Sequence, residues 1–307
     1  MGIPQKATPA TPPGRRFTRG LPQNTIEPYG LDDQGNAGAR KLDQDTSQTL
    51  VLHQMSLMYS LLVVPSDHVA TPPGFLRLAG HPLRWSLLTA LAGSDYRVRE
   101  LVTRVGQPQN LVSYHLRLLR DGGLVTATRS SFDGRDSYYH LDLDRCAAAL
   151  AEAGAALHPA LHVPPVAPVG LQRPGGIAVL FVCTGNSARS PIAEALLRHH
   201  TAGGVTVTSA GSHPKPQLHP QAVRVLHEEF GIDVAGQDPR HLDTVARRRF
   251  DHVITLCDKA REACPEFPHH PRRIHWSIPD PAGYPAFHHT AADIDTRVRH
   301  LLPVLDS

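Results

Sequence analysis

Residues 177–200, IAVLFVCTGNSARSPIAEALLRHH, decide the fold of the second half of the chain. The apolar residues at the start predict a buried strand, and a helix is predicted from Pro191, because proline is tolerated in a first helical turn. Between the two, Cys183 and Arg189 enclose five residues. Such an arc lets successive backbone N–H groups point at one tetrahedral oxyanion on the helix N-terminus. The stretch therefore predicts a strand, an anion-binding loop and a helix in direct succession.

The chemistry of this loop is that of an activated nucleophile. The helix dipole, the inward N–H groups and Arg189 all favour thiolate over thiol at Cys183, and Ser190 is placed to donate a hydrogen bond to the sulfur. Arg189 can also grip two oxygens of the anion at once. The residues expected to bind the oxyanion are Thr184, Gly185, Asn186, Ser187, Ala188, Arg189 and Ser190.

Further along, residues 177–307 alternate apolar runs with helical segments, as an α/β domain with a parallel sheet does. Strands are predicted at residues 177–182, 205–209 and 252–256.

Two further thiols follow the third predicted strand, in VITLCDKAREACPEFP. The four cysteines of the chain are expected to be free thiols, because a long chain without an export signal favours them over structural disulfides. If residues 258–263 are helical, Cys257 and Cys264 are separated by about 10.5 Å of helix rise. A disulfide needs Cα atoms within about 7 Å. Oxidation to a Cys257–Cys264 bridge is therefore expected to unwind that segment.

The loop CTGNSARS, the following SPIAEALL, TSAG at residues 208–211 and WSIPDP at residues 276–281 resemble the low-molecular-weight protein tyrosine phosphatase superfamily, which includes a class of arsenate reductases. The resemblance covers nearly all of residues 177–303. It implies that Asp280 is the general acid for the leaving group, a proton donor that the chemistry needs. Asn186 and Glu194 match positions that help to hold a monovalent cation in some of these reductases; no other metal and no tightly bound cofactor is expected.

Cys257 and Cys264 resemble, residue for residue, the two extra cysteines of the thioredoxin-coupled arsenate reductases. The resemblance implies a relay. Cys183 attacks arsenate, Cys257 attacks Cys183 and releases arsenite, and Cys264 attacks Cys257 to leave a bridge that an external carrier reduces. Thioredoxin is the family's carrier, and a low-molecular-weight thiol is the alternative.

A second block, residues 75–157, has the pattern of a winged helix-turn-helix. Helices are predicted at residues 83–91 and 98–105, and a third begins near residue 109 with an apolar face (Leu111, Val112, His115, Leu116, Leu118 and Leu119). A hairpin of residues 124–129 and 137–143 follows. The residues expected to contact DNA are Gln109, Asn110, Ser113, Tyr114 and Arg117 on the polar helix face, with Arg129 and Arg135 on the wing.

GHPLRWSLLTAL, QNLVSYHLRLLRDGGLV and SYYHLD resemble the ArsR-type winged helix-turn-helix repressors over roughly residues 75–150. Such proteins imply a homodimer formed through this domain. Members that sense arsenite often carry a Cys-x-Cys pair where this chain has Arg97 and Arg99. Arginine cannot replace the thiolates that bind a soft metalloid, so an inducer site, if there is one, lies elsewhere or is shared with another subunit.

The sequence predicts four regions: a disordered segment (1–48), the winged-helix domain with a leading helix at residues 50–64 (49–157), a Pro-rich linker (158–176) and the α/β domain (177–307). A net charge of +3 and a pI of about 8.8 fit nucleic acid or an anionic substrate. No apolar run reaches eighteen residues and the start does not resemble a signal peptide, so the expected location is the cytoplasm, without membrane attachment.

The leading hypothesis is therefore an arsenate reductase fused to a DNA-binding regulator. One alternative is a protein tyrosine phosphatase fused to the regulator, which Tyr284 near Asp280 keeps open, because an aromatic residue after the acid suits phosphotyrosine substrates. Another is a transcription regulator that uses the loop only as an oxyanion sensor.

Overall fold

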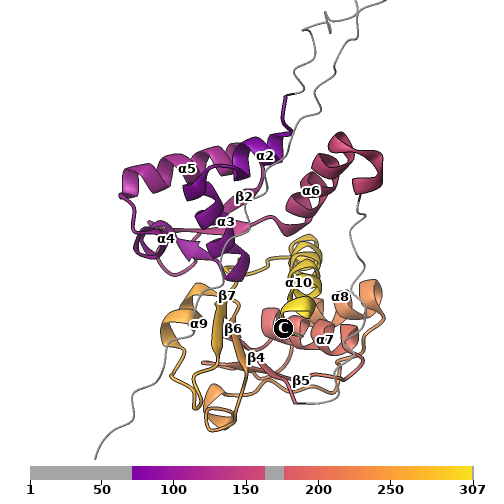
Figure 1. Ribbon diagram of the computed structural model, residues 1–307. Helices are drawn as coiled ribbons and strands as arrows, with labels where there is room; N and C mark the ends of the chain where they lie inside the picture. Colours follow the sequence, from indigo (N-terminus) through magenta and orange to yellow (C-terminus); the bar gives the residue numbers. More distant parts are fainter. Residues whose placement is uncertain (1–70, 163–175, 306–307) are drawn as a thin grey trace, which may run out of the picture. The chain divides into compact units, whose positions relative to one another are not determined.

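Residues 71–162 and 176–305 are described by a computed structural model (Figure 1). The predictions for residues 1–48, for the helix at 50–64 and for most of the linker lie outside these residues. The described residues all belong to one compact unit, 70–307. Within that unit the two predicted domains are both present, so the two-domain prediction is confirmed.

The first domain is a winged helix-turn-helix. Its helices are α2 (Gly74–Ala79), α3 (Pro82–Gly93), α4 (Val98–Val105), α5 (Gln109–Asp121) and α6 (Leu143–Leu157), followed by a 3-10 turn at Pro159–Leu161. Strands β1 (Tyr96–Arg97), β2 (Val125–Arg129) and β3 (Ser137–Leu141) form an antiparallel sheet in the order β1-β3-β2. We call the β2–β3 hairpin the wing, and residues 130–136 the wing tip. Helices α2 and α6 were not predicted.

Local signals explain the helix ends in this domain. The His81 side chain accepts a hydrogen bond from the backbone N–H of Leu83, and Pro82 occupies the first helical position of α3. Helix α4 ends at Gly106, whose φ of 63° is in the left-handed region that favours glycine. On α5 the buried residues are Val112, His115, Leu116 and Leu119. Leu111, predicted on the packed face, is 37% exposed instead.

The second domain is built on a four-stranded parallel sheet in the order β5-β4-β6-β7. The strands are β4 (Ala178–Cys183), β5 (Thr206–Gly211), β6 (His252–Thr255) and β7 (Arg272–His275). The helices are α7 (Arg189–His200), α8 (Pro220–Phe230), α9 (Asp258–Ala263) and α10 (Tyr284–Leu305), with a 3-10 turn at Leu242–Thr244. The predicted parallel sheet is confirmed, although β7 was not predicted.

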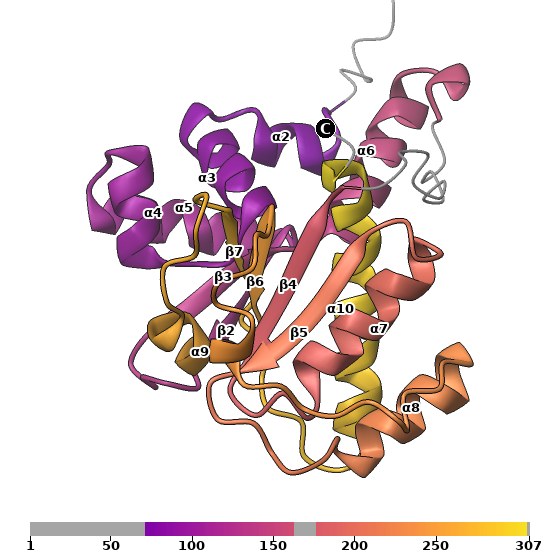
Figure 2. The ribbon, with the colours of Figure 1, turned by 90° about the horizontal axis from the view of Figure 1, so that it is seen from below.

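Helices α7 and α10 pack against each other beside the sheet (Figure 2). The register pairs Cys183 with Gly211 on one side of β4 and Val182 with Thr255 on the other. Since parallel strands present their carboxyl ends at the same margin of a sheet, the segments after β4, β5 and β6 converge there. The site lies at this margin.

The winged-helix domain contacts the second domain through buried polar groups. Asp95 donates its backbone N–H to the carbonyl oxygen of His275, at 2.8 Å, and accepts from the backbone N–H of Ser277 at 2.7 Å. The Asp95 carboxylate also pairs with Arg297 at 3.1 Å. Burial alone would lower the pKa of Arg297, but Asp95 and Asp293 outweigh it and raise the pKa above its ordinary value. Arg297 therefore stays charged, as a buried ion pair requires.

Across the described residues, no helix combines the length and the apolar character needed to span a bilayer.

Candidate active site

The anion loop, residues 183–190, is shaped by hydrogen bonds on its outer side. The carbonyl oxygens of Thr184, Gly185 and Ser187 accept backbone N–H groups from His213, Lys215 and His219, at 2.8 to 2.9 Å. Across a trans peptide bond the carbonyl and the next N–H point in opposite directions. The N–H groups of residues 185, 186 and 188 therefore face into the arc, where an oxyanion would sit.

Asn186 braces the loop from within. Its φ of 44° lies in the left-handed region, which asparagine tolerates better than most residues. Its amide nitrogen donates to Ser190 Oγ and Ser209 Oγ, each at 2.9 Å, and its amide oxygen accepts the backbone N–H of Arg240 at 2.7 Å. A loop conformation held by this many partners is fixed before any anion arrives.

Gly211, at the end of β5, lets this strand approach the loop. A Cβ at this position would lie 2.6 Å from the carbonyl oxygen of Thr184 and 2.9 Å from the backbone nitrogen of Asn186. Both are backbone atoms, which cannot swing aside as a side chain can. Glycine is therefore required here by close approach to the loop.

Cys183 is buried at the centre of the arc. Its Sγ lies 3.0 Å from Ser190 Oγ and accepts the backbone N–H of Asn186 at 3.2 Å. Burial raises the pKa of the Cys183 thiol, and the Ser190 hydrogen bond and the charge of Arg189 oppose this rise without cancelling it. Burial thus opposes the groups that the sequence predicts to favour a thiolate at Cys183.

Part of the charge of Arg189 is shared with the predicted acid. Arg189 Nη2 pairs with Asp280 Oδ1 at 2.7 Å, and Nη1 donates to the carbonyl oxygen of Ile278 at 2.8 Å. The arginine side chain is buried, whereas that of Asp280 is 78% exposed. The aspartate thus stands at the entrance of the loop, where it can reach both solvent and a bound anion.

A cavity of about 380 Å³ opens over the loop. It is lined by Ser131, Cys183, Thr184, Gly185, Ser187, Ala188, Arg189, His213, Lys215, Cys257, Lys259 and Asp280. Three cationic side chains, those of Arg189, Lys215 and Lys259, are among them. Their field favours a small anionic substrate over a neutral one.

Cys257 lies beside the loop. Its Sγ is 3.3 Å from Thr184 Oγ1, and it lines the same cavity as Cys183. Cys257 is the residue before α9, and Cys264 is the residue after it. All four cysteines are free, Cys264 is half-buried, and burial raises the pKa of its thiol, which the charge of Arg273 partly opposes. The structure thus brings Cys257 to Cys183 but leaves Cys264 at the other end of a helix.

Glu194 belongs to a hydrogen-bonded cluster behind the loop. Its buried carboxylate accepts from Ser209 Oγ and from Gln237 Nε2, and it pairs with Arg198 and Arg240. Two guanidinium groups already neutralise this carboxylate. The arrangement favours a structural role for Glu194, which holds neighbouring segments together by hydrogen bonds, over the monovalent-cation site that the resemblance implied for Asn186 and Glu194.

The predicted DNA-contacting residues divide into two groups. On α5, Gln109, Asn110, Tyr114 and Arg117 are exposed and Ser113 is half-buried. On the wing, the Arg129 guanidinium donates to the carbonyl oxygens of Gly134 and Arg135, so it shapes the wing tip, while Arg135 is exposed. The polar face of α5 is thus free to enter a groove.

Several residues of the site were missed in the sequence. Lys215, His213 and Lys259 line the cavity without any motif that marks them. A buried group behind Cys257, formed by Asp258 with His275 and Ser277, was also missed. An Asp at the start of a short helix and a serine before Ile-Pro-Asp are too common to signal it.

The comparisons with known proteins agree with both halves of this description. Residues 178–307 match the family described as low molecular weight phosphotyrosine protein phosphatase, and residues 81–127 match the bacterial regulatory protein, arsR family. The anion loop with its cysteine and arginine lies within the first of these two matches.

Among curated relatives, an arsenate reductase of Brevibacillus brevis is 37% identical over 123 residues, which are 39% of this chain and 90% of the relative. An arsenate reductase of Shouchella clausii is 41% identical over 106 residues, which are 34% of this chain and 73% of the relative. A solved structure described as an arsenate reductase in the phosphate binding state is 29% identical, covers 42% of this chain and 99% of its own, and superposes with a TM-score of 0.37.

Through its second domain the chain belongs to the arsenate reductase family of the low molecular weight phosphatase class. Its first domain contains the segment that matches the arsR-family model.

Proposed function

We propose that this protein reduces arsenate to arsenite by a relay of three cysteines, and that its winged-helix domain binds DNA as a regulator. The observation that carries the enzymatic half is the position of Cys257. Its thiol lies within 3.3 Å of the Thr184 hydroxyl, at the loop that holds Cys183. A phosphatase needs no second thiol at this place, whereas a reductase needs one to accept the oxidation.

The first step forms a bond between sulfur and arsenic. Because burial raises the pKa of Cys183, its proton passes to the entering arsenate dianion, and the sulfur attacks arsenic. Asp280 donates a proton to the oxygen that departs as water. The inward N–H groups and Arg189 stabilise the charge on the remaining oxygens. Arsenic is still in the +5 state in this adduct.

The second step is the reduction. The Cys257 thiolate attacks the Cys183 sulfur, a sulfur–sulfur bond forms, and the sulfur–arsenic bond breaks. Its electron pair remains on arsenic, which leaves as arsenite in the +3 state. Two thiols have then given up the two electrons that arsenic has gained, and the Cys183–Cys257 disulfide remains.

The third step moves the disulfide outward. Cys264 attacks the Cys257 sulfur and frees Cys183, but α9 separates the two cysteines by a rise of about 10 Å. Since a disulfide needs Cα atoms within about 7 Å, α9 unwinds as the bridge forms. Backbone hydrogen exchange across residues 257–264 should therefore be faster in the oxidised protein than in the reduced one. Equal exchange would contradict this step.

An external dithiol then reduces the Cys257–Cys264 bridge, and we propose a thioredoxin. Support comes from the two cysteines at the ends of a short helix, which give a protein partner an accessible disulfide once the helix opens. A low-molecular-weight thiol would act directly on the Cys183–Cys257 disulfide and make Cys264 dispensable. Replacement of Cys264 with serine distinguishes the two carriers.

The test of the function is arsenate-dependent oxidation of NADPH through thioredoxin and its reductase, measured beside hydrolysis of p-nitrophenyl phosphate. Cys257→Ser should abolish the first activity and retain any of the second. Cys146→Ser is the matched control, because Cys146 lies in the winged-helix domain. The proposal fails if the wild-type protein oxidises no NADPH with arsenate, whether a thioredoxin or a glutathione system supplies the electrons.

The phosphatase alternative loses its specific support. Tyr284, expected beside the acid, donates its hydroxyl to Glu228 at 2.6 Å and stacks on Arg224, with its ring centroid 4.1 Å from the guanidinium carbon. It is absent from the residues that line the cavity over the loop.

For the regulatory half, we propose that the exposed polar face of α5 enters the major groove and that the active form is a homodimer. Arg117→Ala should weaken binding to duplex DNA and lower its dependence on salt, because one cationic contact is lost. Titrations of labelled duplex at several salt concentrations measure both. In the oxyanion-sensor alternative, Cys183→Ser would leave arsenate-dependent DNA binding intact.

A further inference from the structure

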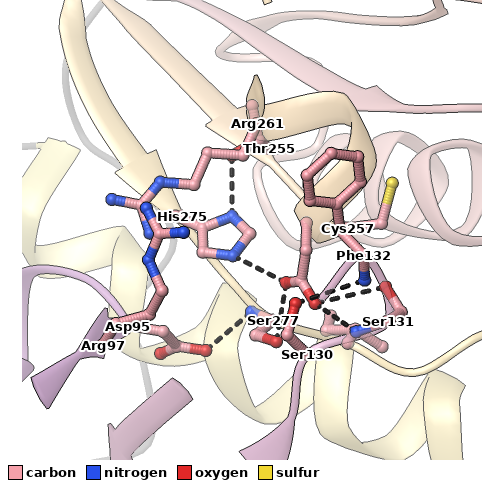
Figure 3. Close-up of polar contacts among 12 residues, drawn as sticks. Asp95, Arg97, Ser130, Ser131, Phe132, Thr255, Cys257, Arg261, His275 and Ser277 are labelled. Atoms are coloured by element: carbon pink, nitrogen blue, oxygen red, sulfur yellow. Dashed lines mark hydrogen bonds and ion pairs between the residues drawn. The ribbon is translucent and has the colours of Figure 1, made fainter. Parts of the chain in front are cut away.

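One residue of the anion cavity comes from the DNA-binding domain. Ser131, in the wing tip, lines the cavity together with Cys183 and Cys257. Figure 3 shows Ser131 in the same group of contacts as Cys257, His275 and Ser277. Its backbone N–H donates to Asp258 Oδ2 at 2.6 Å, and its hydroxyl lies 3.2 Å from the same oxygen. Asp258 directly follows Cys257. The wing therefore reaches the segment that carries the second thiol of the relay.

Asp258 joins this segment to the rest of the enzyme. Its other oxygen, Oδ1, accepts the Ser277 hydroxyl at 2.8 Å and lies 3.1 Å from His275 Nε2. Burial alone would raise the pKa of the Asp258 carboxyl, but the hydrogen bonds from His275, Ser277 and Ser131 outweigh it and hold the pKa well below its ordinary value. A buried carboxylate with partners on both oxygens has one orientation.

Helix α9 has a second attachment to the winged-helix domain. Arg261 pairs with Glu100 of α4 at 2.6 Å, and Glu262 pairs with Arg97 at 3.4 Å. Helix α9 has only six residues, too few to be stable by itself in water. The position of α9 is therefore set by side-chain contacts with residues outside the helix, and several of these residues belong to the other domain.

The wing tip is also held in place from its own side. Asp136 pairs with Arg99 at 3.1 Å and with Arg97 at 3.6 Å. These are the two arginines at the positions where the resemblance to ArsR-type repressors implies a Cys-x-Cys pair. In this chain they fix the wing tip on the side that faces α9.

We propose that the wing is a positioning element of the reductase: Ser131, acting through Asp258, holds the Cys257 thiol at the anion loop for its attack on Cys183. The inference rests on the proposed relay and assigns to the DNA-binding domain a part in its second step. Ser131 does not touch the reacting atoms and is a positioning residue.

The two early steps of the relay depend on the wing to different degrees. Attack of Cys183 on an oxyanion uses the loop, Arg189 and Asp280, none of which bonds to Ser131. Attack of Cys257 on Cys183 needs the two sulfurs aligned, and a misplacement of about 1 Å can cost about 100-fold in rate. Loss of the wing contact should therefore slow disulfide formation far more than it slows chemistry at Cys183 alone.

The test uses the full-length protein with a rapid quench. The rate of the arsenate-dependent Cys183–Cys257 disulfide is measured by mass spectrometry in a Cys264→Ser background, where the relay stops at that bridge. Turnover of p-nitrophenyl phosphate is measured on the same samples. Ser131→Pro removes the backbone N–H and the hydroxyl that donate to Asp258. Asp258→Asn removes the negative charge of the carboxylate that accepts them. Each should slow disulfide formation by about 10- to 100-fold more than it slows phosphate-ester turnover.

Two further variants separate positioning from folding. Ser131→Thr keeps the backbone N–H and a hydroxyl, so it should form the disulfide at the rate of the parent protein. Gly134→Ala alters the same wing tip at a position where a Cβ meets no atom within 4 Å, and should behave as the parent protein.

The possible results are distinct. If the parent protein forms no disulfide with arsenate, the proposed function fails. If the parent forms it and Ser131→Pro and Asp258→Asn form it equally fast, the positioning role is overturned while the function stands. Equal losses of both activities in the two variants would also overturn the positioning role, because they would indicate a general structural effect.

Discussion

The anion loop and helix α9 carry the two thiols that must react with each other, yet they are held in opposite ways. The loop is fixed by backbone hydrogen bonds from residues 213–219 and by the side chain of Asn186. All of these partners belong to its own domain. Helix α9 is fixed by side-chain contacts, and Ser131, Arg97 and Glu100 of the other domain supply several of them.

The difference corresponds to what each region must do. An oxyanion site gains from a fixed array of donors that costs no reorganisation during the reaction. A segment that must bring Cys264 to Cys257 has to open, so its anchors must be few and separately breakable. Side-chain anchors meet that need, because each can be released without unravelling the sheet.

The largest effect is expected where the rigid region is broken. Gly211→Ala places a Cβ against the backbone of Thr184 and Asn186, so the loop must shift. Both arsenate reduction and phosphate-ester turnover should fall by about 100-fold or more, because the donors leave their positions. Steady-state assays of both activities measure this. Gly236→Ala, where a Cβ meets no atom within 4 Å, is the control, and retention of either activity in Gly211→Ala would mean that the loop is less rigid than described.

A smaller effect is expected at the anchor of α9, and it depends on pH. Asp258→Asn should lower the free energy of unfolding at pH 7 by about 2 kcal/mol, the scale of hydrogen bonds to a buried charged group. Because the pKa of Asp258 is depressed by folding, its contribution is present above the ordinary aspartate pKa and is lost as the pH falls through the folded-state value. The difference between wild type and variant should therefore shrink below about pH 4.

Denaturant titrations from pH 7 to pH 3 follow this dependence. Asp243→Asn is the control, because that side chain is 87% exposed. A difference between wild type and Asp258→Asn that stays constant down to pH 3 would show that the carboxylate charge is not what holds α9.

The smallest effect is expected from Glu100→Gln, which weakens the ion pair with Arg261 and also the ion pair and backbone hydrogen bond that Glu100 makes with Arg97. The pair with Arg261 is partly exposed and worth about 1 kcal/mol, which corresponds to about fivefold faster hydrogen exchange in residues 258–263. Exchange in residues 183–190 should not change. Faster exchange in both segments would contradict the conclusion that the loop is held independently of helix α9.

Much of the fold and the centre of the site could be predicted because their signals are contiguous. The anion loop lies within eight residues, between an apolar strand and a helix, so local sequence is enough to place it. Strand β7 was missed because Arg272-Arg273-Ile274-His275 is short and mostly polar. Its His275 is covered in part by Tyr138 and Ser94 of the other domain, which a local pattern does not register.

The contacts around α9 could not be predicted for a different reason. Ser131 and Asp258 are 127 positions apart, and each looks like an ordinary polar residue in a turn or at a helix start. For Cys183, the sequence shows the groups that favour a thiolate but not the burial that opposes them. Both the contacts around α9 and the burial of Cys183 arise only when distant segments pack.

The position of Ser94 and Asp95 against His275 has a consequence for solubility. Strand β7 is hydrogen-bonded to β6 on one side only, and such an outer strand offers free backbone groups to which strands of other molecules can add. The backbone N–H of Asp95 donates to the carbonyl oxygen of His275, and the Ser94 hydroxyl accepts the backbone N–H of His275. The strand also begins with two charged residues, Arg272 and Arg273. The fused regulator thereby caps an aggregation-prone margin of the enzyme.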